Sequence, residues 1–181
     1  MRAVIGAAVL GAACIAQPLA AQERAGVFVE ALGGAAVPTF EIADHITTGA
    51  AFGGTIGIRF GNWVTMAEFD YGMHEAEEFE DVDINTQHYI AKVGYSLTGP
   101  RDHGWEAIVN LGGGVVTFDV EDGESNTYPA INAGAKLSYH FSPMFAVVLS
   151  PQGDIAFSDE DEIGTTNAWV WPVTAGLRVS F

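Results

Sequence analysis

The sequence predicts an all-β fold, an eight-stranded antiparallel up-and-down transmembrane β-barrel, and three observations lead to this prediction. The chain holds eight strand-like segments that are bounded by turn signals. In most of these segments the side chains alternate between an apolar face and a small, polar or charged face. The connections between the segments alternate between short and long, which is the layout of a membrane barrel.

The last segment, WVWPVTAGLRVSF at 169–181, shows the alternation most clearly. Its odd positions hold Trp, Trp, Val, Ala, Leu, Val and Phe, whereas its even positions include Thr174, Gly176, Arg178 and Ser180. In a water-soluble protein the apolar face would need a covering layer of helices or a second sheet. No convincing stretch of the chain has apolar residues at helical spacing, so we expect lipid to cover this face.

The other segments follow in order from the N-terminal side. Each is long enough for the roughly 9–11 residues of a tilted membrane-spanning strand. The first and the seventh alternate less regularly than the rest, and Glu30 and Asp154 identify their inner faces. The eight expected spans are 25–36, 49–61, 63–75, 86–98, 105–118, 128–141, 144–157 and 168–181.

The connections predict which end of the barrel faces which side of the membrane. Three are short, at 61–62, 98–104 and 142–144, and four are long, at 37–48, 76–85, 119–127 and 158–167. Short turns are periplasmic and long loops extracellular in barrels of this type. Aromatic residues beside the short turns fit a membrane-interface girdle. They are Trp63, Trp105, Tyr139, Phe141 and Phe181, while Trp169 and Trp171 lie toward the other rim.

Charged residues fall on the inward face by the same parity rule. An eight-stranded barrel has room inside only for side chains. Single buried charges are costly to desolvate, so charges held there are expected to pair. We therefore predict a lumenal ion-pair network that plugs the barrel; the alternative is a path for protons or ions. The predicted network residues are Glu30, Arg59, Glu68, Asp70, Lys92, Glu106, Lys136 and Arg178.

The N-terminal residues have the pattern of a secretory signal peptide. Arg2 precedes an apolar run from Ala3 to Ala16, and small residues follow at Ala20 and Ala21. We predict cleavage near Ala21, which gives a signal peptide at 1–21 and a barrel at 22–181. The only cysteine, Cys14, lies in the signal segment, so the exported chain is expected to contain no disulfide.

Acidic residues dominate the long loops and give the chain a net charge of −16. Six carboxylates lie in 75–83, four in 119–124 and four in 159–162. The simplest interpretation is a solvated surface that repels anions, and no nucleic-acid partner is expected. The alternative is divalent-cation binding, which we expect to be weak because no loop has EF-hand spacing. No cofactor and no specific metal site are predicted.

One group of residues could support an enzymatic function. His140, Ser142 and Asp154 have the side-chain types of a nucleophilic triad. Their spacing is similar to that in PagL-type lipid A deacylases, but Pro143 and Met144 follow the serine where that family has Asn-Ala-Gly, and that family's acid is a glutamate. Ser142 is also expected in a short turn, about ten residues from Asp154, so no enzyme is predicted.

The whole barrel region resembles the OmpA/OmpX-like outer-membrane β-barrel superfamily. The resemblance rests on AGLRVSF at the C-terminus, on GAKLSYHFSPMFAV at 134–147 and on the inward charges. It implies location in the outer membrane of a Gram-negative bacterium and contact with lipid and lipopolysaccharide. It also implies that the barrel-assembly machinery recognises Phe181. We expect no added peptidoglycan-binding domain, since the chain stops at Phe181.

The sequence therefore predicts a structural or surface-interaction protein: a small outer-membrane barrel with a charged, plugged lumen and acidic extracellular loops. A narrow ion or small-solute channel is the first alternative, and a lipid A-modifying enzyme is the second. The pattern does not identify a ligand, a receptor or an oligomeric state.

Overall fold

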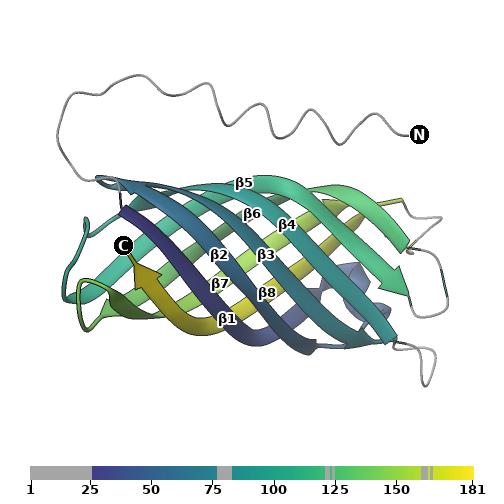
Figure 1. Cartoon of the computed structure of the whole chain (residues 1–181). Helices are drawn as coiled ribbons and strands as arrows, with labels where there is room; N and C mark the ends of the chain where they lie inside the picture. Colours follow the sequence, from purple (N-terminus) through teal and green to yellow (C-terminus); the bar gives the residue numbers. More distant parts are fainter. Residues whose placement is uncertain (1–25, 77–82, 121–122, 124, 160–162, 164) are drawn as a thin grey trace.

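A computed structural model of the chain describes residues 26–76, 83–120, 123, 125–159, 163 and 165–181. Eight antiparallel strands form one closed barrel in sequence order (Figure 1). The elements are β1 (Gly26–Thr39), the 3-10 helix η1 (Phe40–Asp44), β2 (Gly49–Phe60), β3 (Trp63–Glu75), β4 (Asp83–Ser96), β5 (Gly104–Val120), β6 (Ser125–His140), β7 (Phe145–Phe157) and β8 (Asn167–Ser180). No helix in the described part of the chain is long and apolar enough to cross a membrane.

Pairing of the first strand with the last closes the barrel. β1 and β8 pair in antiparallel register from Phe28 opposite Ser180 to Thr39 opposite Trp169. Closure leaves no strand edge with unpaired backbone groups, which hydrocarbon would not tolerate. The predicted fold class is confirmed, and the strand ends differ from the expected ones by at most three residues, as at Ser125 against an expected 128.

The two ends of the barrel differ in their connections (Figure 1). At one end lie the C-terminus and the three short turns. Gly61 makes the tightest of these turns possible, because its φ of 59° is in the left-handed region that favours glycine. The long connections lie at the other end. We refer to these as the short-turn end and the long-loop end.

The outer surface of the barrel is an apolar band. Outward positions hold large exposed side chains such as Ile56, Val93 and Leu111. Aromatic pairs lie in this surface near the short turns: the rings of Trp63 and Tyr95 are 5.1 Å apart, as are those of Trp105 and Tyr139. A surface of this kind is typical of a barrel that lipid surrounds.

The seventh strand alternates less regularly because a proline interrupts its ladder. The paired positions of β6 and β7 stop at Leu137–Leu149 and resume at Gly134–Gln152. Pro151 lies in this gap and has no N–H to donate. The side-chain amide of Gln152 instead donates to the carbonyl oxygen of Ala135, at 3.0 Å. A hydrogen bond from an inward-pointing side chain therefore replaces part of the missing backbone pairing.

The first long connection contains structure that the sequence did not predict. β1 continues to Thr39, beyond the expected end at 36, and η1 follows it directly. Phe40 has a φ of 62° at this junction, and its ring packs edge-on against Trp169 at 5.3 Å. The turn carries the side chains of Ile42 and Ile46 into buried positions over the lumen.

Candidate functional site: the barrel lumen

Seven of the eight predicted network residues form one continuous chain of ion pairs inside the barrel. Cations and carboxylates alternate along it, so that each inner member contacts two opposite charges. In order from the short-turn end, the chain is Arg59, Glu106, Arg178, Glu30, Lys136, Glu68 and Lys92. Seven strands, all except β7, and both halves of the sequence contribute to it, which is possible because all strands share one narrow lumen.

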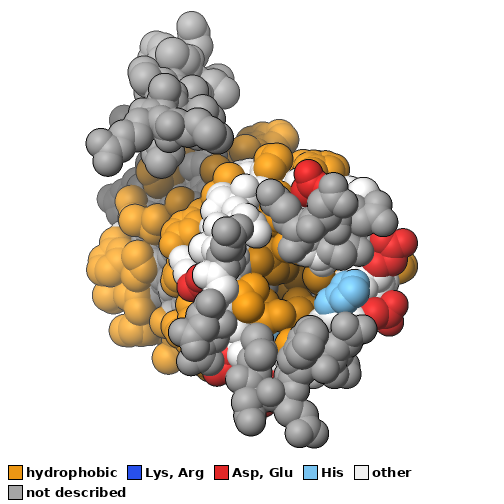
Figure 2. All heavy atoms as spheres, turned by 90° about the vertical axis from the view of Figure 1, so that its right-hand side faces the viewer, with side chains coloured by type: hydrophobic (Ala, Val, Ile, Leu, Met, Phe, Trp, Pro, Cys, Tyr) orange, Lys and Arg blue, Asp and Glu red, His pale blue; other side chains and the backbone are white. Residues whose placement is uncertain are grey.

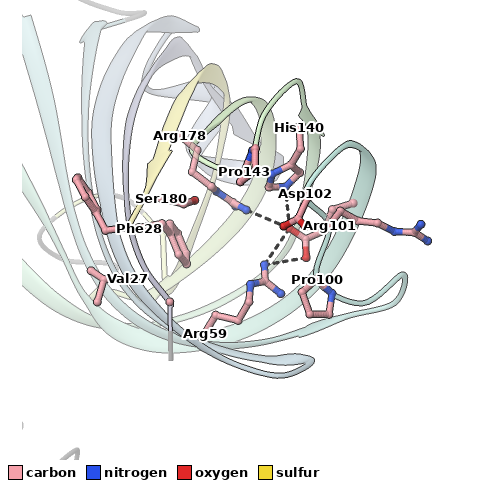
Figure 3. A pocket seen from close by; sticks show the side chains of 13 residues that line it. Val27, Phe28, Arg59, Pro100, Arg101, Asp102, His140, Pro143, Arg178 and Ser180 are labelled. Carbon is pink, nitrogen blue, oxygen red and sulfur yellow. Dashed lines mark hydrogen bonds and ion pairs between the residues drawn. The ribbon is translucent and has the colours of Figure 1, made fainter. Parts of the chain in front are cut away.

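The short-turn end of this ion-pair chain is centred on Glu106, whose partners Arg59, Arg178 and His140 are labelled in Figure 3. The Nη2 atom of Arg59 lies 2.7 Å from one carboxylate oxygen, and the Nη1 atom of Arg178 lies 3.2 Å from the other. Ser96 donates to the same carboxylate at 2.8 Å, and a ring nitrogen of His140 lies 3.2 Å away. Four neighbours thus surround one buried carboxylate, which gives it the hydrogen bonds that a buried charge requires.

The middle of the ion-pair chain is completely enclosed. Lys136 lies between two carboxylates, 2.6 Å from Glu30 and 2.7 Å from Glu68, and its side chain has no exposed surface. Arg178 reaches Glu30 at 2.6 Å. Thr55 donates to Glu68 at 2.9 Å. Each carboxylate therefore has at least two donors.

The ion-pair chain ends at Lys92, which contacts Glu68 and donates to Gln152 at 3.1 Å. A glycine makes room for this lysine, because a Cβ atom on Gly112 would lie 2.8 Å from the Lys92 Cγ. In the same way, the ring of Phe28 occupies the space above Gly57 and stacks 4.4 Å from the guanidinium of Arg178. Glycines on the inner face thus help long side chains fit into a narrow barrel.

Asp70 is the predicted network residue that stands apart from this ion-pair chain. It is buried in the lumen, but it forms no ion pair with a Lys or Arg among the described residues, and its Oδ1 atom has no hydrogen-bond partner there. Asp154 also points inward, where it binds a ring nitrogen of His88 at 2.8 Å and accepts from Asn132 at 2.7 Å. These groups lie between the ion-pair chain and the long-loop end.

The half of the lumen near the long loops is filled differently. Apolar side chains from five strands meet there and are covered by residues of the long connections. This apolar cluster consists of Ile42, Ile46, Ile90, Val116, Phe118, Tyr128, Ala130, Ala156 and Ala168, with Ile84 and Ile163 packed against it. In Figure 2, which views this end, apolar side chains are visible in the middle of the mouth, and the described rim shows carboxylates but no Lys or Arg.

This apolar cluster was not predicted from the sequence, although the parity of the strand residues locates most of it. Val116, Phe118 and Tyr128 have the same parity as Glu106 and Lys136 in their strands, and the structure buries all three. Parity therefore predicted the direction of these side chains. Ile42 and Ile46 had no comparable signal, because they lie outside the strands.

The possible catalytic residues are not brought together. Asp154 pairs with Asn132, eight residues before His140 in β6, a separation of roughly 26 Å along the strand at 3.3 Å per residue. The Ser142 hydroxyl instead accepts a hydrogen bond from the backbone N–H of Phe145 in its turn. Among the described residues, no group of three or more His, Cys, Asp or Glu side chains could hold a metal ion. The acidic stretches at 77–82 and 160–162 lie outside the described residues.

Comparisons with known proteins agree with this geometry. A family model described as "Outer membrane protein beta-barrel domain" matches residues 5–181. Among curated proteins no match is found. Neisserial surface protein A (NspA) is 15% identical over 88% of this chain and 100% of that chain, with a TM-score of 0.62.

Two structures from Pseudomonas aeruginosa are also similar. The N-terminal β-barrel domain of OprF is 17% identical over 87% of this chain and 100% of that chain, with a TM-score of 0.55. The outer membrane protein OprG is 11% identical over 88% of this chain and 97% of that chain, with a TM-score of 0.60. At these identities the similarity shows the fold.

Proposed function

The chain belongs to the outer membrane protein β-barrel domain family, and from this premise we propose that it is a structural, surface-interacting barrel whose lumen is closed. It lies in the outer membrane, with the short turns facing the periplasm and the long loops outside. Its interactions would take place at the apolar belt and at the acidic loops.

One observation carries the proposal of a closed lumen: two different barriers lie one above the other. Ion pairs fill the periplasmic half, and Lys136 at their centre has no exposed surface. Apolar side chains fill the extracellular half, where Ile42 and Phe118 are almost completely buried. An ion would have to displace the paired charges and then cross an apolar region, both at high cost.

Planar-bilayer recording tests this proposal. Purified, refolded protein should give no conductance steps above the bare membrane, whereas a barrel with an open path would give them. Folding must be verified in the same sample, for example by the heat-dependent shift in gel mobility of a β-barrel. Regular steps from the folded parent protein would replace this proposal with the narrow-channel alternative.

A specific observation favours that alternative. Both amide atoms of Asn110, the Nε2 atom of His88 and the Oγ atom of Ser138 are buried without a hydrogen-bond partner among the described residues. Buried polar atoms are almost always hydrogen-bonded, and water supplies the bond where protein does not. Water at these positions would support slow proton transfer. Proton flux into vesicles with no current from larger ions would identify such a path.

No enzymatic step is part of this proposal. Mass spectrometry of lipid A from cells with and without the protein should give the same species. A new deacylated species would support the lipid A-modifying alternative.

Outer-membrane lipid and lipopolysaccharide are the partners that the apolar belt would contact. The barrel-assembly machinery is a further proposed partner, through the C-terminal strand. Phe181 supports this, because the residue is 75% exposed while its backbone N–H donates to the carbonyl oxygen of Val27 at 2.8 Å. Its side chain is thus free for recognition during assembly.

The substitution Phe181→Ala distinguishes recognition of this residue by the assembly machinery from packing of its ring in the folded barrel. We expect the substitution to lower the amount assembled in cells several-fold and to change the free energy of unfolding in detergent by less than about 1 kcal/mol, as for an exposed side chain. Cell fractionation and urea titration measure the two effects. An equal relative loss in both would show that Phe181 acts in packing alone.

A further inference from the structure

We propose that the periplasmic mouth of the lumen is a binding site for a small oxyanion, such as a phosphate or carboxylate group, held by Arg59. A cavity of about 410 Å³ opens there among the ends of the strands and the short turns (Figure 3). Arg59, Arg178 and His140 line its inner part, together with Phe28. This volume is ample for an ion of that size with some bound water.

Positive charge is concentrated at this mouth. Of the seven Lys and Arg residues, Arg2 and Arg24 lie outside the described part of the chain, which leaves five. Three of those five, Arg59, Arg101 and Arg178, line this one cavity, against two acidic side chains, Asp102 and Glu106. The opposite end of the barrel carries a carboxylate-rich rim (Figure 2). An anion in the periplasm would therefore be attracted to this end.

The ion-pair chain leaves the cation at the mouth incompletely neutralised. It contains four cations and three carboxylates, and both of its ends are cations. At the inner end, Lys92 also interacts electrostatically with Asp70. At the mouth, Arg59 has only Glu106, which it shares with Arg178 and His140.

Arg59 also retains donor capacity that the described protein does not use. Its Nη2 atom binds both oxygens of Glu106, at 2.7 and 2.9 Å. Its Nη1 atom is buried and has no hydrogen-bond partner among the described residues. Leaving a charged donor buried and unpaired is costly, so this atom is placed for a partner that comes from elsewhere. The side chain remains 15% exposed toward the cavity, so a ligand can reach it after a small movement.

The chemistry of guanidinium identifies the class of ligand. The planar fork of arginine matches the oxygen atoms of a phosphate or a carboxylate. Arg178 is held in place beside Arg59, because the ring of Phe28 stacks on its guanidinium and Glu30 forms an ion pair with it. In contrast, Arg101 lies on an exposed turn, and Figure 3 shows its side chain pointing away from the other two arginines. Arg59 is therefore the assigned ligand-binding residue.

Calorimetric titration of the refolded barrel with inorganic phosphate tests the site, with chloride at equal ionic strength as the reference. We expect saturable binding with a Kd on the order of 1 mM. Arg59→Gln should weaken it at least tenfold, whereas Arg101→Gln, the matched control at the same mouth, should change it less than threefold. Glu106→Gln should tighten it several-fold, because it removes the carboxylate that competes for Arg59.

A competition experiment with acetate defines the ligand class, and a second variant of Arg59 gives a result even if the first does not fold. Acetate that competes with phosphate would show that the site accepts oxyanions in general, and failure to compete would restrict it to phosphate. If Arg59→Gln does not fold, Arg59→Lys retains the charge but loses the fork and should weaken binding about threefold. The proposal is overturned if phosphate binds no better than chloride, or if Arg59→Gln and Arg101→Gln reduce binding equally, since that would indicate non-specific attraction to a positive rim.

Discussion

The two halves of the lumen, which in the proposed orientation are periplasmic near the short turns and extracellular near the long loops, are filled by different kinds of interaction. In the periplasmic half, a chain of seven alternating charges links β1, β2, β3, β4, β5, β6 and β8, with a small apolar group that includes Val64 and Ile108 beside it. In the extracellular half, the lumen resembles the core of a soluble protein and is covered by η1. The charged half depends on specific pairings, whereas the apolar half depends on filled volume. Mutations in the charged half should therefore lower stability by removing an ion-pair partner, whereas mutations in the apolar half should lower it by removing volume.

The largest expected effect is in the charged half. Lys136→Met should reduce the free energy of unfolding by about 3–5 kcal/mol, because it leaves two buried carboxylates, Glu30 and Glu68, without their shared cation. Urea titration of the barrel in lipid or detergent measures this loss. Lys92→Met should cost less, since Lys92 pairs with one carboxylate and one amide.

A second substitution shows whether pairing is the cause. Adding Glu68→Gln to Lys92→Met should recover part of the stability, because it neutralises the carboxylate that has lost one of its two cations, while Lys136 keeps its pairing with Glu30. A Lys92→Met variant as stable as the parent would mean that the lysine is hydrated, and the periplasmic half would then be a water-filled path.

A smaller effect is expected in the apolar half. Phe118→Ala should cost about 3 kcal/mol, at the low end of the usual range for such changes because Phe118 lies two residues from the end of β5. Phe118→Leu should cost about 1 kcal/mol, since it retains most of the volume. The same urea titrations provide the comparison. Equal losses from both substitutions would show that filled volume does not determine stability in this half.

The smallest effect is expected at the acidic rim, outside both halves. Glu75→Gln changes an exposed side chain and should alter stability by no more than about 0.5 kcal/mol. Calcium should bind the rim with a Kd of roughly 1 mM, as expected for carboxylates that are not arranged as a dedicated site. A stoichiometric micromolar site in calorimetry would contradict this and would make the loops a metal-binding surface.

The fold was predictable from the sequence because lipid imposes a strict rule on each strand. Outward side chains must be mainly apolar and backbone groups must be paired, so parity and turn spacing are sufficient to predict eight strands and closure. The inward direction of Glu30, Lys136 and Arg178 followed from the same rule.

The partners of these charges were not predictable, because they depend on the tilt and stagger of the strands around the barrel. Glu30 and Lys136 are 106 positions apart in the sequence, yet they form an ion pair across the lumen. The apolar cluster was missed for a different reason. The inner face was interpreted as uniformly polar, although Val116 and Phe118 had the correct parity, and η1 has no periodic pattern that would predict it.

Conductance of combined variants tests most directly the claim that two independent barriers close the lumen. Lys92→Ala with Glu68→Ala opens the charged half, and Phe118→Ala opens the apolar half. In planar bilayers we expect neither variant alone to conduct and the triple variant to give small steps, with folding verified in each sample. Steps from the Lys92→Ala/Glu68→Ala variant as large as those of the triple variant would show that the apolar half is no barrier and would contradict the account.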